Sequence, residues 1–174
     1  MASRARAVSS HTIIMGSLID VMFTAFRLWN LAESNEENLA RLVESDPFGL
    51  PTLKQRQHVA KAIRRRFDPA ARDRNLVALA KGGCPPEVWR AVLLWHTTRD
   101  EFLLRDFLVS WLYARYSEGT WRLRSADVVP YIRDLQSRVD IVIKNGWAPE
   151  TELRAANALL RIAVDFGLMT GTLT

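Results

Sequence analysis

Apolar residues recur at intervals of three and four along most of the chain, which predicts a protein built mainly from α-helices. From Ile13 to about Leu31 the pattern is continuous and predicts one long core helix. Caps and helix breakers place seven more helices, which begin at Ser34, Thr52, Asp68-Pro69, Pro86, Asp100, Asp127 and Pro149. The fourth of the eight is expected to end at Gly82-Gly83 and the last near Phe166-Gly167, because glycine commonly follows a helix end.

Two helix starts carry a capping-box signature, in which a Ser or Thr is followed three positions later by Glu or Gln. Ser34 pairs with Glu37 in this pattern, and Thr52 pairs with Gln55. Pro130 is expected in the first turn of the helix that starts at Asp127, where its missing N–H does no harm.

Little β-structure is predicted. The segment "WRLRS" from Trp121 reads as a short strand or extended link, and the tail "LMTGTLT" is compatible with one strand of a small hairpin. We therefore expect a mainly α, compact helical domain of about eight helices over residues 1–174, with helix-turn-helix or winged-helix-like elements. Within it, residues 10–82 form a helix-turn-helix-like subdomain and residues 85–174 a winged-helix-like one.

The positive charge of the chain is concentrated in one block. The 174 residues carry 24 Lys and Arg against 19 Asp and Glu, a net charge of +5. The segment from Leu50 to Arg74 is itself +6, so the rest of the chain sums to −1. A local basic block is typical of a surface that binds a polyanion, and it also occurs on solvated helix faces.

The predicted helix "LPTLKQRQHVAKAIRRRF" has two opposite faces. At about 100° per residue, Lys54, His58, Lys61 and Arg65 fall within about 60° of one another. Leu53, Val59, Ala60, Ile63 and Phe67 lie opposite, so Ile63 should face the core and Lys61 the solvent. Arg64 and Arg66 flank the two faces, with their stems on apolar surface and their charges in water. Arg56 falls on the apolar side, where it needs a carboxylate partner unless the wheel is slightly misplaced.

A helix of this kind after a shorter helix and a tight turn suggests the second helix of a helix-turn-helix. Residues near its start would contact base edges or the adjacent backbone, namely Thr52, Lys54, Gln55, Gln57 and His58; Lys61, Arg64 and Arg65 would contact phosphates. A second candidate lies on the last helix, where Arg154 and Arg161 are seven residues apart on one stripe. A solvated basic face remains the alternative to both.

Other chemistry finds little support in the sequence. The single cysteine, Cys84, excludes a scaffold held by internal disulfides. His11, His58 and His96 are too far apart in sequence for a metal-site pattern, so no metal or cofactor is expected. No phosphate-binding loop, nucleophile elbow or paired-carboxylate motif occurs, so we do not expect an enzyme. Asp20 interrupts the first apolar run, and we expect neither a membrane span nor a signal peptide.

Four segments in this order resemble the BrxA family of the bacterial BREX phage-defence systems: "IIMGSLIDVMFTAF", "LPTLKQRQHVAKAIRRRF", "LLRDFLVSWLYARY" and "NGWAPETELRAANALLRIAVDFGLMTG". The resemblance implies a mostly helical fold with helix-turn-helix or winged-helix elements, and DNA binding without catalysis. The matching defence operons also encode a methyltransferase, an ATPase and a phosphatase-like protein. By position, the family's basic helix corresponds to Thr52–Arg66 and its terminal helix to Glu150–Phe166. This sequence departs from the family by ending at Thr174, where other members continue, which bears on the completeness of a C-terminal wing.

We therefore expect a non-enzymatic, cytoplasmic component of phage defence that binds double-stranded DNA. Two alternatives stay open. The first is a helical subunit whose basic face docks onto other proteins of the defence system, and the second is an RNA-binding helical bundle.

Overall fold

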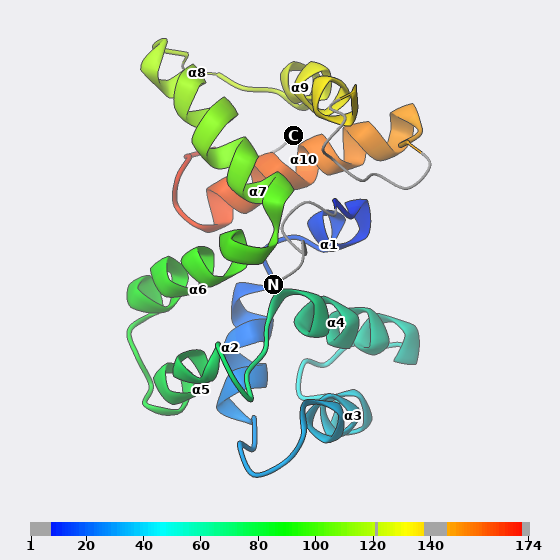
Figure 1. Ribbon diagram of the computed structural model, residues 1–174, viewed down its shortest axis with the longest axis vertical. Helices are drawn as coiled ribbons and strands as arrows, with labels where there is room; N and C mark the ends of the chain where they lie inside the picture. Colours follow the sequence, from blue (N-terminus) through cyan, green and yellow to red (C-terminus); the bar gives the residue numbers. More distant parts are fainter. Residues whose placement is uncertain (1–7, 121, 138–145, 172–174) are drawn as a thin grey trace. The chain divides into compact units, whose positions relative to one another are not determined.

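The computed structural model describes residues 8–120, 122–137 and 146–171, and regular structure in these ranges is helical (Figure 1). The elements are α1 (Ser10–Ile14), α2 (Ile19–Arg27), α3 (Asn35–Ser45), α4 (Leu53–Arg66), α5 (Arg74–Lys81), α6 (Pro86–Asp100), α7 (Phe102–Asp106), the π-helical segment η2 (Phe107–Leu112), α8 (Tyr113–Ser117), α9 (Ser125–Ser137) and α10 (Pro149–Asp165). The prediction of a mainly α protein is confirmed.

The chain divides into two compact units. One is Leu18–Thr97, which contains α4 and is called the α4 unit below. The other combines Met1–Ser17 with Thr98–Thr174 and contains α10, and is called the α10 unit.

The long first helix predicted from Ile13 to about Leu31 is wrong, because the chain breaks between α1 and α2. Gly16 has a φ of +81° and Leu18 a φ of 53°, and neither conformation can continue a right-handed helix. Ser17 in this break donates a hydrogen bond of 2.6 Å to Asp165 at the end of α10. The apolar periodicity therefore continues across a break in the helix. The helices on its two sides, α1 and α2, belong to different units.

Both predicted capping boxes are present. The Ser34 hydroxyl accepts the backbone N–H of Glu37, and the Glu37 carboxylate accepts the backbone N–H of Ser34 at 2.8 Å. The backbone N–H and the hydroxyl of Ser34 both donate to the Glu37 carboxylate at 2.8 Å, and these two bonds lower the pKa of that carboxyl below its ordinary value because they stabilise its charged form. Thr52 and Gln55 form the same arrangement at the start of α4.

The fourth helix begins later than predicted. Asp68 does not cap it; its backbone carbonyl accepts the N–H groups of Ala71 and Asp73 in a turn that precedes α5. The buried carboxylate of Asp73 accepts the Asp68 N–H at 2.7 Å and contacts His96 Nδ1 at 2.5 Å. The end of this helix at Gly82 agrees with the prediction.

Three details of the C-terminal half also differ from the predictions. Asp100 is the last residue of α6 and pairs with Arg99 at 3.1 Å, and the next helix has Glu101 at its N-cap. The helix predicted from Asp127 begins at Ser125, which places Pro130 in its second turn. No strand forms at residues 122–124 or 168–171, while Trp121 and residues 172–174 lie outside the described residues. The start of the last helix at Pro149 and its end before Gly167 are confirmed.

Aromatic side chains hold the α4 unit together. Phe26 of α2 meets Phe67, which directly follows α4, edge to face with ring centroids 5.3 Å apart. Trp89 of α6 lies 5.3 Å from Phe23 and donates its indole N–H to the Ile19 carbonyl at 3.1 Å. Such pairs fix helix positions as well as burying area. The C-terminal end of α4 is therefore anchored to the core of its unit.

The α10 unit is organised around α10, whose buried face is rich in alanine (Ala155, Ala156, Ala158 and Ala163). Both α1 and α9 pack against this helix. Glu152, only 6% exposed, accepts hydrogen bonds from Arg133 at 2.8 Å and Gln136 at 3.0 Å, both on α9. Its charge is therefore paired where it is buried.

Candidate nucleic-acid interface

Helix α4 carries six Lys and Arg and no acidic residue. Its first turn is closed by the Thr52–Gln55 capping box. The Thr52 hydroxyl accepts the Gln55 N–H at 3.2 Å, and the Gln55 amide oxygen accepts the N–H and O–H of Thr52 at 3.3 and 3.0 Å. These two predicted base contacts are therefore already hydrogen-bonded to each other.

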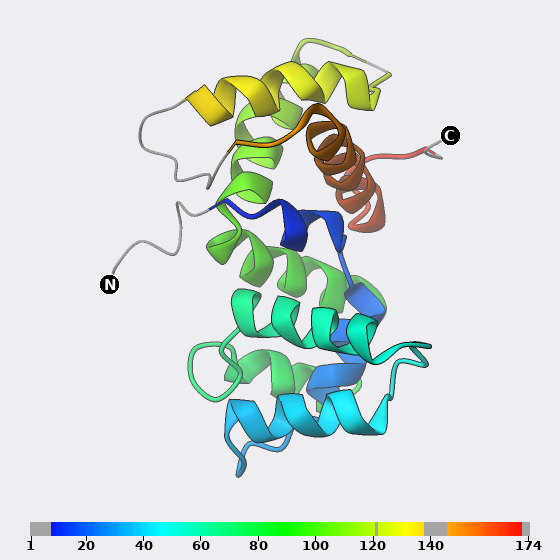
Figure 2. The same cartoon turned by 90° about the vertical axis from the view of Figure 1, so that its right-hand side faces the viewer.

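Helices α3 and α4 run side by side in opposite directions (Figure 2). They are joined by residues 46–52, which is longer than the tight turn predicted from the sequence. In this connection Asp46 and Gly49 have φ values of 45° and 65°, and the Asp46 carboxylate accepts the Leu50 N–H at 3.0 Å. The helix-turn-helix identity of the pair stays a prediction.

The orientation predicted for α4 is confirmed at its centre. Val59 is 3% and Ile63 1% exposed, whereas Lys54 and Lys61 are exposed to solvent. His58 and Arg65, which share the predicted stripe with the two lysines, are half-buried. The solvent-facing part of the stripe is therefore the Lys54 and Lys61 side.

The buried face is rotated relative to the predicted one. Leu53 was assigned to it but is 54% exposed, while Arg66 was expected to keep its charge in water but is 1% exposed. Burial of Ala62 and Arg66 moves the centre of this face by about 70° around the helix at 100° per residue. Arg56 is half-buried and donates to the Val43 carbonyl at 3.1 Å, near the end of α3, where a cation is favourable. Its partner is thus a backbone carbonyl, where the sequence suggested a carboxylate.

Arg64 and Gln57 are exposed on the side of α4 that faces α3. Arg64 lies 3.8 Å from Glu36, and both side chains are more than 60% exposed, so this ion pair contributes little and leaves the Arg64 charge accessible. Lys54, Lys61 and Arg64 together form what we call the cationic ridge of α4.

An open groove follows the contact between α3 and α4, and the sequence analysis did not identify it. Its apolar lining comes from Leu39, Ala40, Val43, Leu53 and Ala60, and its edges carry Glu36, Glu44, Gln57, Lys61 and Arg64. Leu39 and Val43 are four residues apart, and Leu53 and Ala60 seven, so each pair shares a helix face. That spacing was visible in the sequence, but only the pairing of the two helices shows that both faces meet.

Arg154 and Arg161, the second predicted site, are both exposed on α10. They belong to the α10 unit and form a candidate separate from the cationic ridge.

Two features are absent from the described residues. No group of three or more His, Cys, Asp or Glu there could hold a metal ion. Likewise, none of the described helices combines the length and the apolar character required to cross a membrane.

Comparison with known proteins gave one match. The family model described as BrxA matches residues 15–174, which is nearly the whole chain. No curated protein and no solved structure matches.

Proposed function

Because the chain belongs to the BrxA family, and is thus a component of the BREX phage-defence systems, we propose that it binds double-stranded DNA through the cationic ridge of α4. The proposed role is non-enzymatic and needs neither metal nor cofactor. Its ligand is cellular or phage DNA, which places the protein in the cytoplasm.

The observation that carries the proposal is the position of the three ridge cations. Lys54, Lys61 and Arg64 are exposed along a helix that has no acidic residue and whose opposite face is buried. Lys54 and Lys61 are separated by about 10 Å along the axis, at 1.5 Å per residue. A rigid row of cations of this kind can contact successive phosphates, which supplies most of the affinity in nonspecific DNA binding.

If α4 were only a solvated basic face, its cations would be expected where the helix dipole favours them. This explains only some of the basic residues. Cations in the last turn, such as Arg64, are favourable beside the negative end of the helix dipole. Lys54 lies in the first turn, where the dipole disfavours a cation and where an acidic residue would stabilise the helix. A bound phosphate at that end would be favoured by both Lys54 and the dipole.

The other predicted site residues would contribute to DNA binding in different ways. Gln57 is exposed and is the best placed to contact a base edge, whereas the side chains of Thr52 and Gln55 mainly close the helix. His58 and Arg65 lie at the edge of the ridge, where Arg65 contributes longer-range charge. Arg154 and Arg161 would provide a second phosphate contact from the α10 unit.

The groove between α3 and α4 favours a second candidate function, the docking of another protein of the defence system. Leu53 is half exposed there, and charges of both signs flank the apolar lining. An amphipathic helix of a partner could bind such a surface. This function uses Leu53 and Val43, so it can be separated from phosphate binding by mutation.

Fluorescence anisotropy with a labelled duplex of about 30 base pairs tests the proposal. The Lys54/Lys61/Arg64→Ala variant should bind at least about tenfold more weakly than the wild type. The matched control is Arg27/Lys81/Arg90→Ala, which removes three exposed cations from the same unit and changes the net charge equally. Equal losses in both variants would indicate a net-charge effect and contradict a localised interface.

Unlabelled competitors separate the alternatives. Duplex DNA should displace the probe, whereas structured RNA of the same length should compete more weakly. A preference for RNA would favour an RNA-binding bundle. Absence of duplex binding at low salt would leave docking through the groove as the better account.

A further inference from the structure

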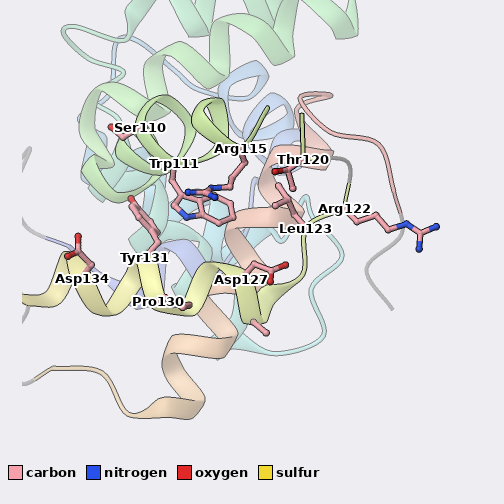
Figure 3. Close-up of a pocket in the computed structure, with 11 residues that line it drawn as sticks. Ser110, Trp111, Arg115, Thr120, Arg122, Leu123, Asp127, Pro130, Tyr131 and Asp134 are labelled. Carbon is pink, nitrogen blue, oxygen red and sulfur yellow. The ribbon is translucent and has the colours of Figure 1, made fainter. Parts of the chain in front are cut away.

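A second concave site lies in the α10 unit, where η2 and α8 face the first turns of α9 (Figure 3). The open cavity has a volume of about 780 Å³, within the range of pockets that bind small molecules. Its lining includes Trp111, Arg115, Leu123, Asp127 and Tyr131. Aromatic, cationic and anionic groups thus border one space, which could not be anticipated from the sequence because they come from separate helices.

The aromatic wall is held in place by its neighbours. Trp111 is half-buried and stacks on Phe107, with centroids 5.3 Å apart and planes at 19°. Tyr131 lies 6.0 Å from Trp111 and donates its hydroxyl proton to Asp106 at 2.7 Å. A fixed aromatic surface loses little entropy when a planar ring stacks on it, which is how proteins hold unpaired bases.

Arg115 supplies a hydrogen-bond donor beside this wall. Its guanidinium carbon lies 5.9 Å from the Trp111 ring centroid, and its Nη1 pairs with Glu118 at 2.8 Å. Its Nε is buried and has no hydrogen-bond partner among the described residues. A buried donor without a partner is unfavourable. That atom has almost no accessible surface, so a ligand oxygen would bond to the terminal nitrogens of this guanidinium, whose side chain is 43% exposed.

Asp127 supplies acceptors on another side of the cavity. Its Oδ2 accepts the Arg124 N–H at 2.7 Å, and within the described ranges Oδ1 accepts no hydrogen bond. Figure 3 shows Trp111, Tyr131 and Asp127 bordering the same space, whereas Arg122 extends away from it. The cavity therefore offers a stacking surface, one N–H donor and one carboxylate.

From this arrangement we infer that the cavity binds the base of an unpaired nucleotide and prefers guanine. The base stacks against Trp111, as unpaired bases do on aromatic side chains. Guanine presents N1–H and its amino group side by side, so both can donate to the Asp127 carboxylate. Its carbonyl or phosphate oxygen accepts from the terminal nitrogens of the Arg115 guanidinium. Thymine has a single N–H between two carbonyls, which a carboxylate repels.

The inference goes beyond duplex binding by α4, since the cavity lies in the other unit and uses none of its residues. An unpaired guanine can come from a free nucleotide or from a single strand. The base makes the same contacts in both cases, and the experiment below distinguishes a free nucleotide from a single strand.

Isothermal titration calorimetry with dGMP, dTMP and glucose tests the inference, together with a 15-mer of thymidine with or without one central guanine. The wild type should bind dGMP or the guanine-containing 15-mer at least about tenfold more tightly than its thymine counterpart. Binding of dGMP indicates that a free nucleotide suffices. Binding of the 15-mer alone indicates that the strand is required. Either result supports the inference.

Three variants locate the binding. Asp127→Asn should reduce the preference for guanine to less than about threefold. The amide group of Asn places an N–H donor where guanine also presents N–H donors, so one of the two hydrogen bonds is lost. Asp20→Asn, an exposed Asp of the α4 unit, is the matched control and should leave the preference unchanged. Trp111→Phe keeps an aromatic core contact and should weaken binding of every base, with folding checked by circular dichroism.

Absence of guanine binding at millimolar concentration would overturn the inference. Equal affinity for guanine and thymine, a preference for glucose, or an unchanged preference in Asp127→Asn would do so too. The Lys54/Lys61/Arg64→Ala variant should keep its guanine binding, so a failure of duplex binding and a failure of this inference can be told apart.

Discussion

Replacement of Asn38 by Ala should destabilise the α4 unit by about 3 kcal/mol, because three short hydrogen bonds depend on this fully buried amide. Asn38 Oδ1 accepts the Asn30 N–H at 2.7 Å and an Arg41 N–H at 2.6 Å. Asn38 Nδ2 donates to the Asn30 carbonyl at 2.8 Å. Each such bond contributes about 1 kcal/mol, and more when its partner is left buried without a replacement.

The hydrogen bonds that Asn38 makes to Ser34 and Glu33 add little to the expected loss of about 3 kcal/mol. The Ser34 carbonyl also accepts the backbone N–H of Asn38, and the contact with the Glu33 carbonyl is long at 3.5 Å. The three shortest bonds are counted at about 1 kcal/mol each. The Asn30 carbonyl also accepts the Glu33 N–H at 3.2 Å and Arg41 also donates to the Glu33 carboxylate at 3.1 Å, so the Asn30 N–H is the group most affected by the loss of the amide.

Urea denaturation followed by circular dichroism measures the effect. Asn38→Ala should lower the midpoint with little change in the denaturant slope. Asn75→Ala, at an exposed position of α5, is the matched control and should change the free energy of unfolding by less than about 0.5 kcal/mol. A loss below about 1 kcal/mol for Asn38→Ala would refute the view that this amide fixes the segment between α2 and α3.

Three further predictions concern α3 and α4. Ile63→Ala should cost about 2–5 kcal/mol of unfolding free energy, whereas Lys61→Ala should cost less than about 0.5 kcal/mol; similar values in urea denaturation would contradict the orientation of α4. Thr52→Ala should cost about 1 kcal/mol through loss of the N-cap and Thr52→Ser much less, and equal midpoints for both would rule out a capping role. The pKa of Glu37 is lowered in the folded state, so its contribution is complete above the ordinary carboxyl pKa and is lost as the pH falls through the folded value. Glu37→Gln should therefore make urea midpoints less dependent on pH below about 5, and an unchanged dependence would count against this linkage.

Features set by neighbouring residues could be predicted from the sequence. The two capping boxes and the proline start of α10 need only residues within one turn, and all three are present. The core position of Ile63 also followed from periodicity, because the two faces of α4 differ strongly in polarity.

Features set by contacts between distant segments could not be predicted in this way. Gly16 lies within an unbroken apolar pattern, and its positive φ depends on a chain path that joins two units. Burial of Arg66 and exposure of Leu53 depend on how α4 packs against its unit, and a helical wheel treats the helix alone. The cavity beside Trp111 exists because α9 lies across from η2 and α8, so no single segment of the sequence contains its pattern.

The salt dependence of duplex binding tests the central claim most directly. Each phosphate contact adds about 0.9 to the slope of log K against log salt concentration. Lys54/Lys61/Arg64→Ala should therefore have a slope shallower than the wild type by about 2.7, while Arg27/Lys81/Arg90→Ala should retain the wild-type slope. Equal slopes for the wild type and the ridge variant would contradict phosphate binding by α4.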